Sequence, residues 1–314
     1  MIAVMRVAIY TAAACCLAAQ AGAAEKAYLF SYFKGNGEDG LHLAASHDGL
    51  DWTPLNGDRP IVRPEVGHRL MRDPSIVRGP DGTFHMVWTT SWNNRVIGYA
   101  HSRDLVDWAP QRAIGVMEHE PTARNCWAPE LFFDEPSGRF LIFWATTIPG
   151  RFPSTLGSSE DQYNHRIYST TTKDFESFTP TRLFFDPGYN VIDAYLTRSG
   201  ERYVLFYKDE TLKPQPRKLI LMATAERPDG PFEVQGEPIS AEDWVEGPSA
   251  LEVDGRWFLY YDAYRRGGYG AVASADLAKW ENITEQISMP EGMRHGTAFE
   301  VEPEILERLK RLER

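Results

Sequence analysis

Five runs of aromatic and β-branched residues recur along the chain, each bounded by polar turn residues. Short apolar runs between turn signals such as Pro-Asp-Gly at 80–82 and Pro-Ser-Gly at 136–138 are typical of buried strands in hairpins. We therefore predict that each run is the second strand of a small antiparallel sheet. The runs begin at Tyr28 (YLFSYF), Phe84 (FHMVWTT), Phe140 (FLIFWATT), Tyr203 (YVLFYKD) and Trp257 (WFLYYDAY).

A second set of apolar segments, each with a polar residue near its start, lies just before four of these runs. They begin at Arg72 (RDPSIV), Trp127 (WAPELFFD), Val191 (VIDAYLT) and Val245 (VEGPSALEV). The fifth, RHGTAFEV at Arg294, has no run after it, whereas the run at Tyr28 has no such segment before it. We predict that the N- and C-terminal strands complete one sheet together, which removes the free edges of a repeat array.

A phrase of the type SxDxxxW follows each run and sets the repeat. Its starts are separated by 56, 70, 52 and 50 residues, a period that indicates a propeller or a solenoid. We predict an all-β, five-bladed β-propeller over residues 25–302, followed by a short helix over 303–314. In each phrase the Ser and Asp should form the turn between the third and fourth strands, and the Trp should pack between blades. The phrases start at Ser46, Ser102, Thr172, Thr224 and Ser274.

Residues 1–24 resemble a secretory signal peptide. An apolar run over 7–19 follows Arg6 and precedes Ala-Gly-Ala at 21–23, and it is too short to span a membrane. Cleavage would leave Cys126 as the only cysteine, so we predict no intrachain disulfide and a periplasmic or secreted protein. One alternative is a lipoprotein acylated at Cys15, although Ala12 stands where a leucine is usual.

The net charge excludes some partners. It is −11, and −12 once Arg6 leaves with the leader, and the chain has no basic run. Such a chain has no electrostatic reason to bind nucleic acid or an anionic membrane, so a neutral substrate fits better. Nine Trp and fourteen Tyr suit both sheet packing and stacking on sugars, and composition does not separate these uses.

Polar residues near the starts of the five first strands should converge, because first strands line the channel of a propeller. These residues are Asp73, Glu130, Asp193, Glu246 and His295. Clustered carboxyl groups raise one another's pKa, which keeps a protonated acid available near neutral pH. Glycoside hydrolysis needs such a set: a protonated acid for the leaving oxygen and an ionised carboxylate across the sugar ring.

The motifs RDPSI, WAPEL, VIDAYL, VEGPSAL and RHG, in this order and one per blade, resemble glycoside hydrolase family 43 from about Tyr28 to Val301. The resemblance implies a five-bladed propeller that inverts configuration at furanoside or xyloside bonds. It implies Asp73 as the general base, Asp193 as the aspartate that tunes the acid, and Glu246 as the general acid. His295 matches a histidine near the channel axis, where many members hold a calcium ion or a water cluster.

Two departures from the family pattern leave the sugar open: Ala194 stands where proline is commoner, and Glu130 where aspartate is commoner. Structural alternatives also stay open. Asp73 could be a turn residue, Asp193 an acceptor for backbone amides, and Glu130 a structural acid of the channel. His295 could be a core histidine or could hold a central ion through water, since calcium prefers oxygen ligands.

Other residues are candidates for substrate contact. Trp92 and Trp127 are predicted to stack on a sugar, with core packing as the alternative. The insertion over 147–165, rich in Pro, Ser and Gly, should form a rim loop on the leaving-group side and favour exo action. Arg166 follows it and could reach substrate hydroxyls, although a solvated arginine is the alternative.

These residues predict a secreted, inverting exo-glycosidase, an α-L-arabinofuranosidase acting on polysaccharide side chains or oligosaccharides. Asp73 would activate water and Glu246 would protonate the leaving oxygen, its pKa raised by neighbouring negative charge, with the two carboxyl groups about 6.5–9.5 Å apart. A β-xylosidase, a β-galactofuranosidase and a non-catalytic carbohydrate-binding propeller remain alternatives. We expect no cofactor for the chemistry, a possible Ca²⁺ in the central channel, and a monomer.

Overall fold

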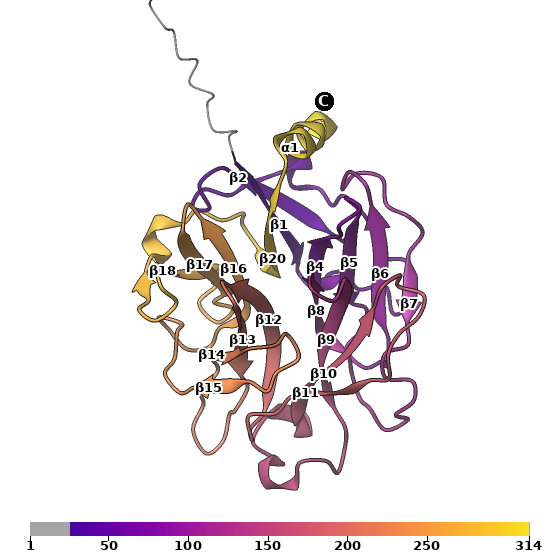
Figure 1. The fold of residues 1–314 in the computed structure, drawn as a ribbon, viewed down its shortest axis with the longest axis vertical. Coiled ribbons are helices and arrows are strands. Elements are labelled where there is room, and N and C mark those ends of the chain that lie inside the picture. Colours follow the sequence, from indigo (N-terminus) through magenta and orange to yellow (C-terminus); the bar gives the residue numbers. More distant parts are fainter. Residues whose placement is uncertain (1–25, 314) are drawn as a thin grey trace, which may run out of the picture.

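The computed structural model describes residues 26–313 and arranges them as a ring of five small antiparallel sheets, a five-bladed β-propeller (Figure 1). The fold prediction is therefore confirmed, whereas the predicted leader at 1–24 lies outside the described residues. Each blade has four strands. From the innermost strand to the outermost, the blades are β20-β1-β2-β3, β4-β5-β6-β7, β8-β9-β10-β11, β12-β13-β14-β15 and β16-β17-β18-β19.

The inner strands are the segments with a polar residue near their start, and the second strands are the aromatic runs. The inner strands are β20 (Met293–Val301), β4 (Arg72–Arg78), β8 (Trp127–Asp134), β12 (Val191–Ser199) and β16 (Glu246–Val253). The second strands are β1 (Ala27–Lys34), β5 (Phe84–Thr89), β9 (Arg139–Thr147), β13 (Arg202–Asp209) and β17 (Arg256–Asp262).

The fourth strand is the shortest in every blade. The third strands are β2 (His42–Ser46), β6 (Ile97–Ser102), β10 (His165–Thr172), β14 (Leu219–Ala225) and β18 (Tyr269–Ser274). The fourth strands are β3 (Thr53–Pro54), β7 (Arg112–Ile114), β11 (Arg182–Phe185), β15 (Glu233–Gln235) and β19 (Glu281–Asn282). Short 3-10 turns occupy Asn56–Asp58, Pro153–Thr155, Glu160–Gln162, Thr284–Gln286 and Arg311–Glu313.

The ring closes through the two chain ends, as predicted. Strand β20 pairs antiparallel with β1, with Ala27 opposite Val301 and Ser31 opposite Thr297. This pairing supplies the innermost strand of the first blade, so the inner edge of β1 is covered.

The repeated phrase lies between third and fourth strands in all five blades, and in four copies its Asp forms the predicted turn. In the first copy Asp48 Oδ1 accepts hydrogen bonds from the backbone N–H groups of Leu50 (2.8 Å) and Asp51 (3.0 Å). The Trp of that copy, Trp52, makes edge-to-face contacts with Phe30 of β1 and Tyr260 of β17, which belong to adjacent blades. The phrase therefore stabilises the turns and the joints between blades.

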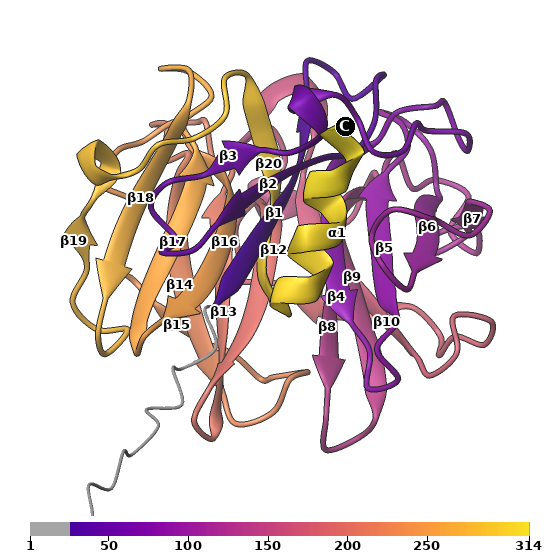
Figure 2. The ribbon, with the colours of Figure 1, turned by 90° about the horizontal axis from the view of Figure 1, so that it is seen from above.

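The chain ends in helix α1 (Pro303–Lys310), which lies beside β1 and β4 (Figure 2). Leu306 and Leu309 are buried in the same apolar cluster as Leu29 and Met86, so the helix covers the joint between the first and second blades. No helix among residues 26–313 is long and apolar enough to cross a membrane.

Candidate active site

A backbone irregularity at the same place in the five inner strands sets the direction of the site residues. In β20, β4, β8, β12 and β16 the pairing register shifts there. In four of these strands the residue at the shift has a positive φ: 51° for Asp73, 45° for Ala128, 51° for Asp193 and 60° for Gly247. Such β-bulges redirect side chains and are common next to active sites.

The predicted convergence of the five polar residues on one spot is wrong in one detail. Because of the bulges, these residues lie at different depths along the channel. Glu246 stands just before the bulge and Glu130 stands two residues after one. Glu130 is buried deeper in the channel, where it accepts hydrogen bonds from the hydroxyls of Ser75 (2.6 Å) and Thr297 (3.2 Å). Burial raises the pKa of Glu130 to about 7. Glu130 does not line the cavity described below, and its contacts favour the structural alternative for this residue.

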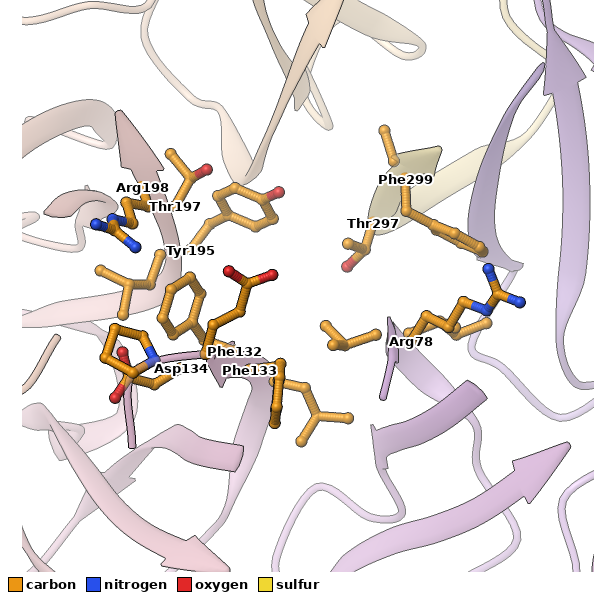
Figure 3. A pocket seen from close by; sticks show the side chains of 16 residues that line it. Arg78, Phe132, Phe133, Asp134, Tyr195, Thr197, Arg198, Thr297 and Phe299 are labelled. Carbon is orange, nitrogen blue, oxygen red and sulfur yellow. The ribbon is translucent and has the colours of Figure 1, made fainter. Parts of the chain in front are cut away.

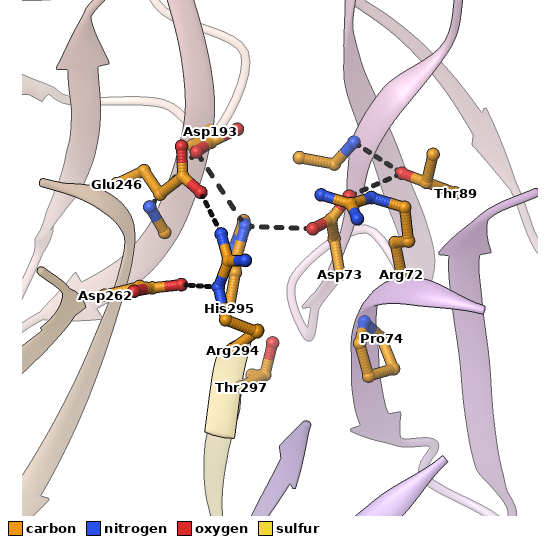
Figure 4. A network of polar contacts seen from close by, with 12 residues as sticks. Arg72, Asp73, Pro74, Thr89, Asp193, Glu246, Asp262, Arg294, His295 and Thr297 are labelled. Carbon is orange, nitrogen blue, oxygen red and sulfur yellow. Dashed lines mark hydrogen bonds and ion pairs between the residues drawn. The ribbon is translucent and has the colours of Figure 1, made fainter. Parts of the chain in front are cut away.

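The other predicted residues meet at one cavity of about 660 Å³ at the starts of the inner strands. Figure 4 shows Asp73 on one side of His295, with Asp193 and Glu246 on the other. The carboxyl groups come from three different blades. The predicted residues that line the cavity are Asp73, Trp92, Trp127, Asp193, Glu246 and His295.

His295 bridges the two sides of this cavity. Its Nδ1 lies 3.4 Å from Asp73 Oδ1 and 3.8 Å from Asp193 Oδ2. Burial works against protonation, but the carboxylates of Asp193 and Asp73 outweigh it and raise the pKa of His295 to about 9. Gly247 leaves room for the ring, because a Cβ there would lie 2.3 Å from the His295 Cγ.

The residues around His295 do not fit a calcium ion held by this imidazole. A protonated ring has no free lone pair, and calcium takes six to eight oxygen ligands. Within the described part of the chain, no three His, Cys, Asp or Glu side chains are arranged as metal ligands. With a pKa of about 9, His295 itself carries a positive charge in this part of the channel near neutral pH.

Asp73 is held in the ionised form. Its Oδ2 accepts a hydrogen bond from the Thr89 hydroxyl (2.7 Å), which in turn accepts one from the Ala128 N–H (2.8 Å). Burial would raise the pKa of Asp73, but His295, Arg72 and Thr89 outweigh it and lower the value to about 2. Such a carboxylate can accept a proton from water at neutral pH.

Glu246 is bound by two cations, which contradicts the expected raised pKa. Its Oε2 lies 3.1 Å from Lys208 Nζ and its Oε1 lies 3.0 Å from Arg294 Nη2. Burial favours the neutral form, but Lys208 and Arg294 outweigh it and lower the pKa of Glu246. Both cations have a second carboxylate partner, Glu210 for Lys208 (2.8 Å) and Asp262 for Arg294 (2.5 Å).

The raised pKa belongs to Asp193 instead. Its Oδ2 accepts a hydrogen bond from the Gly247 N–H (3.1 Å). Burial and the negative charge of Glu246 outweigh the positive charge of His295 and raise the pKa of Asp193 to about 7. A proton on this pair of carboxyl groups is therefore held by Asp193 in preference to Glu246.

An aromatic wall completes one side of the cavity. Trp127 is half-buried and makes an edge contact with Trp92, at 5.5 Å between ring centroids. Trp127 also contacts Tyr163 and His165, which close the rim loop 147–165. Both predicted tryptophans thus lie where a sugar could stack, and Trp92 is 47% exposed.

Arg166 does not take the predicted position. Its side chain is 1% exposed, forms an ion pair with Asp186, and donates hydrogen bonds to Thr155 Oγ1 (3.0 Å) and Asn164 Oδ1 (3.2 Å). It is absent from the residues that line the cavity. The prediction of a substrate contact, and the alternative of a solvated arginine, are both wrong, because the rim loop folds back over this side chain.

Several cavity residues were not predicted. Lys208 could have been suspected from its place at the end of an apolar run, since a lysine there must be paired if it is buried. Arg294 adjoins His295 in the motif RHG, and Thr89 ends the run FHMVWTT. Tyr163 and His165 carry no sequence signal, because only the folded rim loop brings them to the cavity.

A second cavity, of about 470 Å³, lies at the opposite ends of the inner strands (Figure 3). Arg78, Tyr195 and Phe299 are among its lining residues, but Asp73, Asp193 and Glu246 are not. The three predicted catalytic carboxyl groups therefore belong to the first cavity alone.

A five-bladed propeller with Asp73, Asp193 and Glu246 at one axial cavity is the arrangement that the resemblance to glycoside hydrolase family 43 implies. The family described as "Probable glycosyl hydrolase domain", related to glycoside hydrolase family 43, matches residues 24–306. The chain therefore belongs to this family of glycosyl hydrolases, and the resemblance seen in its motifs is confirmed.

One curated relative is an α-L-arabinofuranosidase of Bifidobacterium longum subsp. longum, 23% identical over 201 residues. The match covers 56% of this chain and 18% of that much longer protein. Similar solved structures show the same fold. An α-L-arabinofuranosidase from Lactobacillus brevis is 20% identical with a TM-score of 0.54, over 71% of this chain and 73% of the other.

Two further structures extend the comparison of the fold. A GH43_1 enzyme from Xanthomonas citri, complexed with xylotriose, is 15% identical with a TM-score of 0.51, over 70% of this chain and 76% of the other. An exo-β-1,3-galactanase from Clostridium thermocellum is 13% identical with a TM-score of 0.54, over 73% of this chain and 51% of the other.

Proposed function

We propose that this protein is an inverting, exo-acting glycosidase that removes α-L-arabinofuranosyl units from oligosaccharides or polysaccharide side chains. The observation that carries the proposal is the placement of Asp73 and Glu246 on opposite sides of His295 in one cavity (Figure 4). An ionised carboxylate across the site from a second carboxyl group is the arrangement that single displacement by water requires.

In this mechanism Asp73 deprotonates a water molecule that attacks the anomeric carbon. His295 and Thr89 hold the carboxylate of Asp73 ionised and fix its direction, because each lies against one of its oxygens. The separation of the two carboxyl groups should leave room for that water, about 6.5–9.5 Å.

Glu246 donates its proton to the leaving oxygen, and Asp193 supports it. Because Lys208 and Arg294 favour the ionised form of Glu246, the protonated fraction grows as the pH falls. We therefore expect the highest activity on the acidic side of neutrality, where Glu246 is protonated and Asp73, with a pKa of about 2, stays ionised.

The choice of sugar draws on arabinofuranosidases among the similar proteins. A β-xylosidase and a β-galactofuranosidase are the alternatives within the class, and a non-catalytic sugar-binding propeller is the alternative outside it. The exo action draws on the rim loop, from which Glu160, Asp161 and Tyr163 narrow the cavity. The predicted leader would place this activity in the periplasm or the medium, and we propose a monomer.

Two substrates whose leaving groups differ in their need for protonation distinguish the general acid from the general base. Glu246→Gln should lose about 10²–10⁴ in kcat on an arabino-oligosaccharide but much less on 4-nitrophenyl α-L-arabinofuranoside, whose leaving group needs little protonation. Asp73→Asn should lose activity on both substrates. Glu130→Gln, a buried carboxyl outside the cavity, is the matched control and should keep most of its activity.

Proton NMR of the first sugar released should show the inverted anomer. Equal losses of Glu246→Gln on both substrates, or no loss, would contradict the acid assignment. A wild-type protein that binds sugars but cleaves no furanoside or xyloside would favour the binding-module alternative.

A further inference from the structure

The residues just before the bulges form a ring around the cavity, one from each inner strand. All five line the cavity, and two of them are arginines. Because they share a register position, their side chains surround the same layer of the channel mouth. The members of this ring are Arg72, Trp127, Ile192, Glu246 and Arg294.

The two arginines of the ring differ in their partners. Arg294 is neutralised by the carboxylates of Asp262 and Glu246, at 2.5 and 3.0 Å. Arg72 makes one side-chain hydrogen bond among the described residues, from Nη1 to Asn36 Oδ1 (3.2 Å), and forms no ion pair with any of them. A guanidinium carries five N–H donors, so most of those of Arg72 have no partner in the protein.

The orientation of Arg72 is nevertheless fixed. Its Cζ lies 4.3 Å from the ring centroid of Trp92 and 4.6 Å from that of Phe33. Contacts with aromatic faces hold a guanidinium through its flat surface and leave its edge free for hydrogen bonds. The bulge at Asp73 brings both residues to the cavity, and Figure 4 shows the Arg72 guanidinium beside the carboxylate of the proposed base.

We propose that Arg72 binds two neighbouring oxygen atoms of the sugar whose glycosidic bond is cleaved. The inference rests on the proposed function and adds a specificity residue to it. A planar fork of N–H groups fits a pair of acceptors, which vicinal hydroxyls of a neutral sugar or the carboxylate of a uronic acid would both supply. The base and the guanidinium then act on the same sugar, because both side chains line the same cavity.

The experiment compares Arg72→Lys and Arg72→Met with the wild type on four 4-nitrophenyl glycosides. These are the α-L-arabinofuranoside, the β-D-xyloside, the β-D-galactofuranoside and the β-D-glucuronide. Arg124→Met is the matched control, because Arg124 also contacts an aromatic ring, Tyr163 at 4.1 Å, but does not line the cavity.

If Arg72 binds sugar hydroxyl groups, the wild type cleaves a neutral glycoside and both Arg72 variants lose about 100-fold in kcat/KM. This loss equals about 2.7 kcal/mol at 1.36 kcal/mol per tenfold. If Arg72 binds a carboxylate, the wild type cleaves the glucuronide, and Arg72→Lys keeps part of the rate that Arg72→Met loses. A merely electrostatic effect on Asp73 would spare Arg72→Lys on neutral sugars. Variants within twofold of the wild type, like Arg124→Met, overturn the inference.

A protein that cleaves none of the four glycosides refutes the proposed function but still tests Arg72. Tryptophan fluorescence then follows titrations with L-arabinose and with D-glucuronate, since Trp92 touches this arginine. A loss of affinity of about tenfold in Arg72→Met supports the inference, and equal affinities of the two proteins for both sugars overturn it.

Discussion

Gly247→Ala tests whether the protein depends on close packing between β16 and His295. Gly247 has a φ of 60°, and a Cβ on it would lie 2.3 Å from His295 Cγ. The substitution therefore adds two costs: about 1–2 kcal/mol for an alanine in the left-handed region and about 1–3 kcal/mol for overpacking against the ring. We expect a total loss of about 2–5 kcal/mol in the free energy of unfolding.

Gly200→Ala separates the two costs. Gly200 also has a φ of 60°, but nothing lies within 4 Å of its added Cβ. This control should lose only the backbone cost, so the difference between the two variants in urea denaturation measures the clash. Gly247→Ala should also lower kcat/KM, because a displaced His295 no longer holds Asp73, whereas Gly200→Ala should not. Equal stability and full activity in both variants would refute the reasoning.

Two further predictions concern buried cations. In Lys208→Met, loss of the cation raises the pKa of Glu246, so the alkaline limb of kcat/KM against pH should move to higher pH. The control Lys218→Met removes a cation that is bound to Glu210 and not to Glu246, so the alkaline limb should stay in place. An unmoved alkaline limb in Lys208→Met would contradict this account. Arg166→Met should destabilise the protein by about 3 kcal/mol and expose the rim loop to proteolysis, because it leaves Asp186 without its partner. An unchanged melting temperature with a raised KM would instead favour the substrate contact that the structure contradicts.

The fold could be predicted because its determinants repeat. Five apolar runs, each followed by the same turn phrase, predict five blades without any knowledge of the strand register. The unpaired segments at Tyr28 and Arg294 show how the ring closes. The bulges could not be predicted, because period and composition are the same on both sides of a register shift. For this reason Glu130 was expected at the level of Asp73, although it lies deeper in the channel.

The carboxyl groups of the candidate site could be predicted from the sequence, but their pKa values could not. Asp73, Asp193 and Glu246 stand in motifs at blade spacing, whereas the pKa of Glu246 depends on Lys208, which is 38 residues away in the chain. A cation that reaches the site from a second strand has no fixed spacing to the acid it controls. The burial of the Arg166 side chain likewise depends on the conformation of the irregular rim loop.

The strand that closes the ring also supplies two groups of the site. Strand β20 follows every other strand in the chain, and it carries both Arg294 and His295. The first four inner strands can therefore assemble an incomplete pocket that lacks the imidazolium and one of the cations on Glu246. Hydrolysis would begin only when β20 docks against β1, so enzymatic turnover in a refolding experiment should report the final step of ring assembly.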